Sequence, residues 1–148
     1  MEELLLRLIQ GIKDELPWLS LVDEDCGQLE SEEDQYPVTF PCVLVGNTDI
    51  EWSNMAENSA VQFGTGTITV RLAIDCYDDT HAGSGQEGKM AERQQQAKDL
   101  YKCLQGAQVV REVQPLCRVK SHDYTLPGNI KVYEQIYRFE MIDKSAMG

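Results

Sequence analysis

The sequence lacks long apolar runs, paired cysteines and a basic balance of charge, and each absence argues against a class of protein. No stretch approaches the roughly 18 consecutive apolar residues of a transmembrane helix, so we expect no membrane contact. The five cysteines form no C-x-x-C pair, which indicates reduced thiols in a cytoplasm. The formal net charge is −12, so the surface should repel nucleic acid, and we expect no sequence-specific nucleic-acid binding.

The usual signatures of catalysis are missing as well. The sequence has no G-x-S-x-G stretch of a serine hydrolase. A thiol–imidazole pair would need Cys76 with His81 or His122, but Cys76 alternates with apolar positions and is expected in the core, as are Cys42 and Cys103. The sequence therefore predicts no catalytic residue and no cofactor.

One glycine-rich stretch, THAGSGQEGKMAER, resembles two kinds of phosphate-binding loop. Gly83, Gly85 and Gly88 fit G-x-G-x-x-G, and the first and last of these glycines, with Lys89, fit the start of a P-loop. However, Met90 stands where a P-loop needs serine or threonine to reach magnesium. Acidic residues on both sides also oppose a phosphate. We interpret the stretch as a connection that holds no nucleotide.

A cluster of polar residues after the central strand leaves a second class of function open. Asp75, Asp78, Asp79 and His81 lie close together in the sequence, and carboxylates with imidazole can bind a divalent ion. Their spacing matches no dedicated metal loop, so the prediction is that no metal is bound. A small enzyme or metal-binding protein with a site at Asp75–His81 remains the alternative.

The apolar periodicity predicts an α+β fold. Alternating strands indicate a mainly antiparallel sheet of about four to five strands with two helices packed on one face. In the alternating strand TITVRLAIDCY, Arg71 falls on the other, partly wet face. The predicted helices are residues 2–16 and 89–105, and the predicted strands are residues 18–22, 41–52, 67–77, 116–124 and 130–142, with a hairpin turn at 126–129.

No repeat or linker divides the chain, so residues 1–148 are expected to form a single domain. Residues 23–35 are predicted to be a flexible acidic loop, because seven acidic residues fall within twelve positions without one lysine or arginine. Polar, glycine-bearing residues predict two further long loops at 53–66 and 78–88. Loops of this kind carry recognition.

The order of these elements, with "VRLAIDCYDD" before the second helix and "VYEQIYRFEM" near the end, resembles the tail-terminator and tail-completion proteins of tailed bacteriophages and prophages. The resemblance covers nearly the whole chain, and the acidic segment at 23–35 departs from it. It implies a structural protein that forms a ring, often of six subunits, on the end of the tail tube. Its implied partners are other copies of itself, the tail tube protein and the head–tail connector protein.

The resemblance also implies a place and a set of contacts. Such a protein would be present in the cytoplasm of the host bacterium during assembly and then in the virion tail. The sheet edges and the two polar loops at 53–66 and 78–88 are the candidate patches, and the candidate partner contacts are Trp52, Asn54, Gln62, Asp78, Asp79 and His81. An adaptor or a secretion-tube component outside phage is a second alternative to the tail function.

If the stretch from Gly83 to Lys89 holds no phosphate, then ATP, GTP or NAD with magnesium will leave the melting temperature unchanged. A ligand at a hundred times its dissociation constant would stabilise the fold by about 2.7 kcal/mol, which thermal unfolding detects easily. A reproducible rise in melting temperature that disappears in Lys89→Ala would contradict this interpretation.

Overall fold

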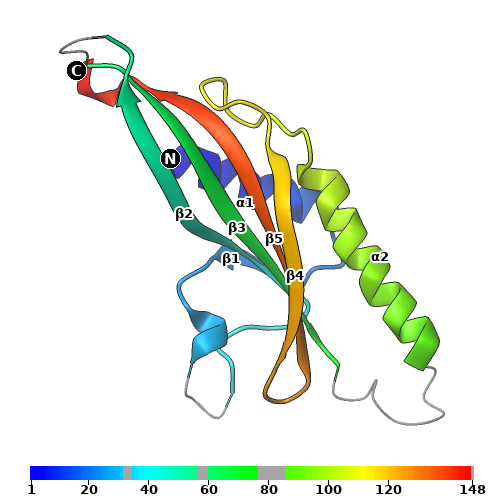
Figure 1. The fold of residues 1–148 in the computed structure, drawn as a ribbon. Helices are drawn as coiled ribbons and strands as arrows, with labels where there is room; N and C mark the ends of the chain where they lie inside the picture. Colours follow the sequence, from blue (N-terminus) through cyan, green and yellow to red (C-terminus); the bar gives the residue numbers. More distant parts are fainter. Residues whose placement is uncertain (32–34, 57–59, 77–85, 148) are drawn as a thin grey trace.

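The computed structural model describes residues 1–31, 35–56, 60–76 and 86–147, in which a long, twisted sheet carries helices on one side (Figure 1). No helix in these ranges is long and apolar enough to cross a membrane. In chain order the elements are α1 (Glu2–Glu15), β1 (Leu21–Glu24), the 3-10 helix η1 (Gln28–Glu30), β2 (Cys42–Asn54), β3 (Gln62–Asp75), α2 (Gln86–Leu104), β4 (Cys117–Leu126), β5 (Ile130–Asp143) and the 3-10 helix η3 (Ser145–Met147).

The five strands form one sheet in the order β1-β2-β3-β5-β4. β1 runs parallel to β2, and every other neighbouring pair is antiparallel. The predicted α+β class with a mainly antiparallel sheet is therefore confirmed. The predicted turn between the last two strands is also present, with positive φ at Gly128 and Asn129, as a tight hairpin requires.

Both helices pack on the same face of the sheet, as the sequence predicts. Leu4, Leu8 and Ile12 recur every four residues along α1 and are buried, since this spacing places side chains on one side of a helix. The buried core on this face also contains residues of α2, β3 and β5. They are Ala97, Leu100 and Leu104 of α2, Ile68, Val70, Leu72 and Ile74 of β3, and Tyr133, Tyr137 and Phe139 of β5.

A buried glutamine ties α2 to the sheet beneath it. Gln135 donates a hydrogen bond to the carbonyl of Ala97 (3.0 Å) and accepts one from the Tyr137 hydroxyl. Burial raises the pKa of Tyr137 above its ordinary value. The hydroxyl therefore stays protonated and able to donate at neutral pH.

The loop predicted at 53–66 is largely wrong, because strands occupy most of it. β2 continues to Asn54 and β3 begins at Gln62, so only residues 55–61 connect them. The glycines that suggested flexibility are instead paired in the sheet: Gly64 lies opposite Trp52, and Gly66 lies opposite Ile50. Likewise, α2 begins at Gln86, so Gly88 and Lys89 lie in its first turns, while residues 78–85 of the third predicted loop are outside the described residues.

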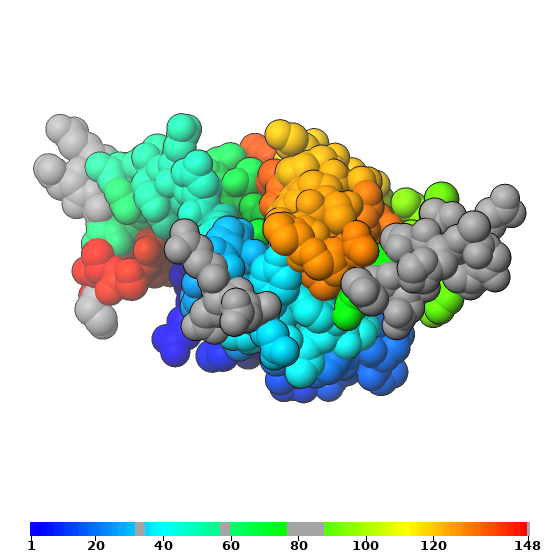
Figure 2. Space-filling model, turned by 90° about the horizontal axis from the view of Figure 1, so that it is seen from below, coloured from blue at the N-terminus to red at the C-terminus, as the bar shows by residue number. Residues whose placement is uncertain are grey.

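Near Arg71 the other face of the sheet is covered by the chain and is not exposed to solvent. The expectation that this arginine would be exposed is therefore wrong. Residues 25–31 and 35–41, between β1 and β2, return across this face, and Leu29, Tyr36, Val38 and Phe40 pack on its apolar residues. In Figure 2 this segment, in cyan, lies against the orange β4–β5 turn. The Tyr36 hydroxyl donates to the Pro127 carbonyl at 2.9 Å in agreement with that view.

The acidic stretch at 23–35 is correspondingly more structured than predicted. β1 includes Asp23 and Glu24, and η1 includes Glu30. Asp25 is buried, and its backbone N–H donates to the Val45 carbonyl at 2.9 Å, which extends the pairing of β1 with β2. Residues 23–30 of the stretch therefore form part of the sheet edge and of the cover over the second face.

Arg71 holds this cover in place, and the five N–H groups of its guanidinium are matched by five hydrogen bonds. Nε and Nη2 donate to the two carboxylate oxygens of Asp25 (2.8 and 3.0 Å). Nη1 and Nη2 donate to Glu30 (2.6 and 3.1 Å), and Nη1 also donates to the Tyr124 hydroxyl (3.1 Å). Burial lowers the pKa of Arg71, but the bonds to Glu30, Asp25 and Tyr124 raise it above its ordinary value, so the group remains charged.

Replacement of Arg71 by alanine is expected to cost about 3–5 kcal/mol of stability, because it leaves the buried Asp25 carboxylate without its cation. Urea unfolding measures this change. The matched control is Arg138→Ala, since Arg138 is half-exposed and pairs with Glu140 on the surface; its cost should stay within about 0.5 kcal/mol. Similar small losses in both variants would contradict the structural role of Arg71.

Candidate partner surface

Three strands extend beyond the helices to form an arm, defined here as residues 49–54 of β2, 62–67 of β3 and 138–143 of β5. Figure 1 shows the arm running to the upper left, with the C-terminus at its tip. The pairing is continuous across it, since Asn54 lies opposite Gln62, and Gln62 lies opposite Asp143. The arm is therefore a sheet of three hydrogen-bonded strands along its whole length.

Trp52 is the largest exposed apolar side chain of the arm. It is 41% exposed and its ring crosses Gly64, so closely that a Cβ added to Gly64 would lie 2.7 Å from the ring. Ile50 crosses Gly66 in the same way. Glycine in a strand often marks a close approach of this kind. The two glycines thus let Ile50 and Trp52 lie flat on the helix-bearing side of the arm.

The structure brings three of the predicted contact residues together. Trp52 and Asn54 are two residues apart on β2, so they share a face of the strand. Gln62 lies opposite Asn54 and donates a hydrogen bond to its side-chain oxygen at 3.1 Å. Trp52, Asn54 and Gln62 therefore form one exposed surface at the end of the arm. The other predicted contacts, Asp78, Asp79 and His81, lie outside the described residues.

A hollow of about 380 Å³ adjoins this surface. Its lining includes apolar side chains from the arm, from the start of α1 and from the segment before β4, among them Trp52, Met1, Leu4, Val113 and Met141. Charged groups also line it, including Asp143, whose pKa is lowered by hydrogen bonds from Ser145. Apolar side chains with charged groups around them are also the arrangement found in protein–protein interfaces.

The alternative site near Asp75 does not include His122. Asp75 lies opposite Ile130, whereas His122 lies opposite Glu134, four residues farther along β5. That offset is about 13 Å at the usual rise of a strand. His122 instead contacts Glu134 at 3.0 Å. Across the described ranges, no three His, Cys, Asp or Glu side chains gather in a way that could hold a metal ion.

The thiols expected in the core are where the sequence places them. Cys42 and Cys76 are buried, and Cys103 packs against the core. Burial raises the pKa of Cys42 to about 11. Burial and the neighbouring Glu15 raise the pKa of Cys103 to about 12. Both are therefore protonated at neutral pH and poor nucleophiles.

The group that fixes the second face, namely Arg71, Asp25, Glu30 and Tyr124, is not predicted from the sequence. One signal was present: a single arginine interrupts an otherwise apolar alternation, and an all-acidic segment elsewhere has no cation of its own. A charge inside a strand pattern usually has a partner when it is buried. The two features could have been matched, although the spacing does not say which carboxylates meet the arginine.

Comparison with known proteins gives a fold but no family. No family model matches the chain, and no curated protein matches it in sequence. Among solved structures, a chain from the virion of a native gene transfer agent particle has the same fold, with a TM-score of 0.62 and 11% sequence identity. The match covers 96% of this chain and 96% of that chain.

Replacement of Gly64 by alanine is expected to displace the Trp52 ring, because the new methyl group would lie within 3 Å of it. The emission of Trp52, recorded in a Trp18→Phe background, should shift to the red as the ring becomes more solvated. Gly11→Ala is the matched control, since a Cβ there meets nothing within 4 Å and alanine favours a helix by up to about 1 kcal/mol. An unchanged spectrum in Gly64→Ala would show that the ring does not lie on this glycine.

Proposed function

We propose that this protein is a structural component of a tailed phage or prophage virion that caps the tail tube as a ring and joins it to the head connector. It acts by assembly and not by turnover of a substrate. The observation that carries the proposal is the fold, which extends over 96% of the chain and matches a chain of a gene transfer agent virion. The tail position rests on the resemblance in element order described above.

The arm gives the proposal a physical basis. A capping protein must offer a stiff surface to the end of a tube. In the arm, Trp52 and Asn54 of β2 and Gln62 of β3 lie in a sheet of three paired strands, of which β5 is the third. Aromatic side chains such as Trp52 are enriched at protein interfaces because they bury large apolar area with little loss of freedom. The partners proposed for this surface are the tail tube protein and the connector protein, with other copies of the chain at the sides.

The charge of the chain suits a protein through which DNA must pass. Asp and Glu outnumber Lys and Arg by 25 to 13. A ring with an acidic surface would repel the phosphate backbone and leave the DNA free to move. We place the protein in the host cytoplasm during assembly and in the tail of the finished virion.

Deletion of the gene from the encoding phage or prophage tests the proposal directly. Electron microscopy of the particles is expected to show tails of uncontrolled length, or tails that are not joined to filled heads. Expression of the intact protein from a plasmid should restore normal particles. Normal infectious particles from the deletion strain would refute the capping function.

A point variant then tests the arm. In the complementation assay, Trp52→Ala should lower the yield of infectious particles at least tenfold while the purified protein keeps its melting temperature, because the side chain is used in contacts and not in the core. Leu6→Ala is the matched control, since Leu6 is an exposed apolar residue of α1. Equal yields from the two variants would remove the arm from the proposed contact.

A further inference from the structure

Two strand edges of the sheet are unpaired within the described part of the chain. β4 is the last strand on one side and pairs only with β5. On the other side, β1 pairs with β2 only as far as Val45, so β2 from Gly46 to Asn54 has no described neighbour beyond β3. Unpaired edges offer rows of N–H and C=O groups that another strand can bind.

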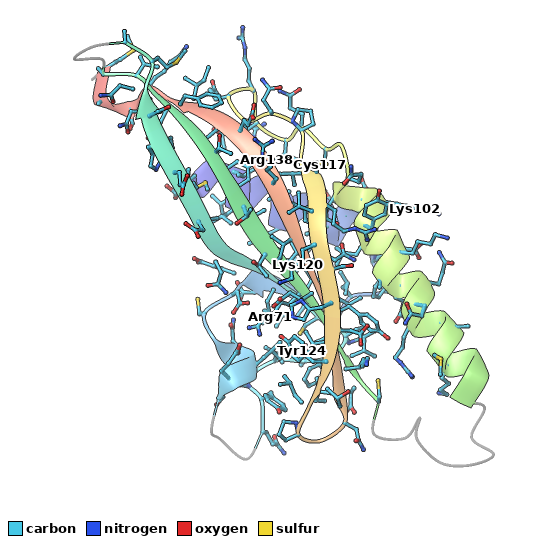
Figure 3. The ribbon with its side chains drawn as sticks, viewed as in Figure 1. Arg71, Lys102, Cys117, Lys120, Tyr124 and Arg138 are labelled. Atoms are coloured by element: carbon cyan, nitrogen blue, oxygen red, sulfur yellow. The ribbon has the colours of Figure 1, made fainter. Side chains whose placement is uncertain are left out.

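The two edges carry opposite charges on the same face of the sheet. On β4, Lys120 and His122 share the face of Arg71 and are exposed, and Figure 3 shows Lys120 on the side toward the viewer, above Arg71. On the free part of β2, Asp49 and Glu51 are exposed on that same face. Within the described residues, neither Lys120 nor Glu51 has an ion-pair partner.

We infer that β4 of one copy pairs with the free part of β2 in a second copy, so that neighbouring copies continue one sheet. The inference deepens the proposed function and rests on it, because a contact between two different patches of one chain is what builds a ring. A lysine at an edge can also serve only to prevent aggregation. Here the opposite edge carries the complementary charge, and this favours a second copy over an unrelated partner.

The strand directions fit such a contact. The antiparallel pairs from β2 through β3 and β5 to β4 make β4 run opposite to β2. A second copy in the same orientation therefore places its β2 antiparallel to β4. If Glu51 lies opposite Lys120, the antiparallel register also places Asp49 opposite His122, whose imidazole contacts Glu134 in its own chain; the complementary charge pair of this register is therefore Glu51 with Lys120. Opposite charges directly across a strand pair stabilise it.

This register displaces the second copy along the strand direction, and the size of the displacement agrees with the stagger found in closed sheets. Glu51 aligns with Thr65 of β3, and Lys120 aligns through Ile136 with Thr69. The second copy is therefore displaced by four residues, about 13 Å, while β2 of the next copy is four strand spacings away, about 19 Å. The ratio gives a strand tilt of about 35°, at the lower end of the range in closed β-barrels.

Charge reversal tests the contact in the full-length protein. Lys120→Glu and Glu51→Lys should each raise the concentration at which copies associate at least tenfold, because like charges would then face each other. The double variant K120E/E51K should restore association, since every contact is complementary again. Analytical ultracentrifugation up to millimolar concentration measures this. Glu92→Lys and Lys102→Glu, both on α2, are the controls with the same changes in net charge.

Disulfide trapping covers the case in which the free protein associates too weakly to be seen. K120C/E51C, with Cys26 and Cys117 changed to serine, should give a ladder of oxidised oligomers at millimolar concentration, because directly opposed residues lie at a distance that a disulfide can span. Each single cysteine variant should stop at a dimer. Absence of the ladder, together with no effect of the charge reversals, would overturn the inference.

The two proposals can fail separately. If the deletion gives aberrant tails but K120E and E51K complement it as well as the wild type does, the edge contact is wrong and the capping function stands. If the copies pair through these edges in solution but the deletion leaves particles normal, the contact stands and the capping function is wrong.

Discussion

The guanidinium of Arg71 is the point on which the second face of the sheet depends. It comes from the central strand β3 and binds Asp25 after β1, Glu30 in η1 and Tyr124 on β4. Asp25 and Glu30 are far from Tyr124 in the sequence, and the one guanidinium joins all three at this face. A buried carboxylate is tolerated only when it is paired, so Asp25 and Arg71 require each other.

This arrangement also explains why the two halves of the sheet differ. Near Arg71, residues 25–31 and 35–41 cover the second face, and β1 occupies the edge of β2. Beyond Val45 neither cover nor neighbour is present in the described residues, and the strands continue as the arm. The exposed end that we assign to partner contacts therefore begins after Val45, where the strands are no longer covered by the segment that Arg71 binds.

Much of the fold could be predicted from the sequence because its signals are local. The spacing of Leu4, Leu8 and Ile12 predicts the buried face of α1. The alternation through Ile68, Val70 and Leu72 predicts the buried side of β3. The cover over Arg71 could not be predicted, since it depends on where a non-periodic segment returns after its strand. The sequence predicts a loop at 53–66 because glycines such as Gly64 and Gly66 usually indicate flexibility, whereas in the arm these two accommodate the side chains of Trp52 and Ile50 on the neighbouring strand.

The residues of the candidate surface could be predicted from the sequence, but the way in which they come together could not. Asn54 and Gln62 fall in the predicted loop at 53–66, and Trp52 is the last residue of the strand predicted before it. The three residues share one surface, but strand pairing and not a flexible tip brings them together. Sheet edges are among the patches predicted for contacts between copies, but the sequence pattern does not say which strands form the free edges or that these edges carry opposite charges. An edge is a property of strand order, which alternation along one strand does not specify.

The long pairing of β2, β3 and β5 has a mechanical consequence. Hydrogen bonds in an antiparallel ladder lie perpendicular to the strands, so a pull along the arm loads the whole series of bonds in shear, and they must fail together. A sideways pull on the free edge of β2 would instead peel the bonds apart one pair at a time. The arm is therefore built to transmit tension along its axis, and it is weakest at the edge where no described strand supports it.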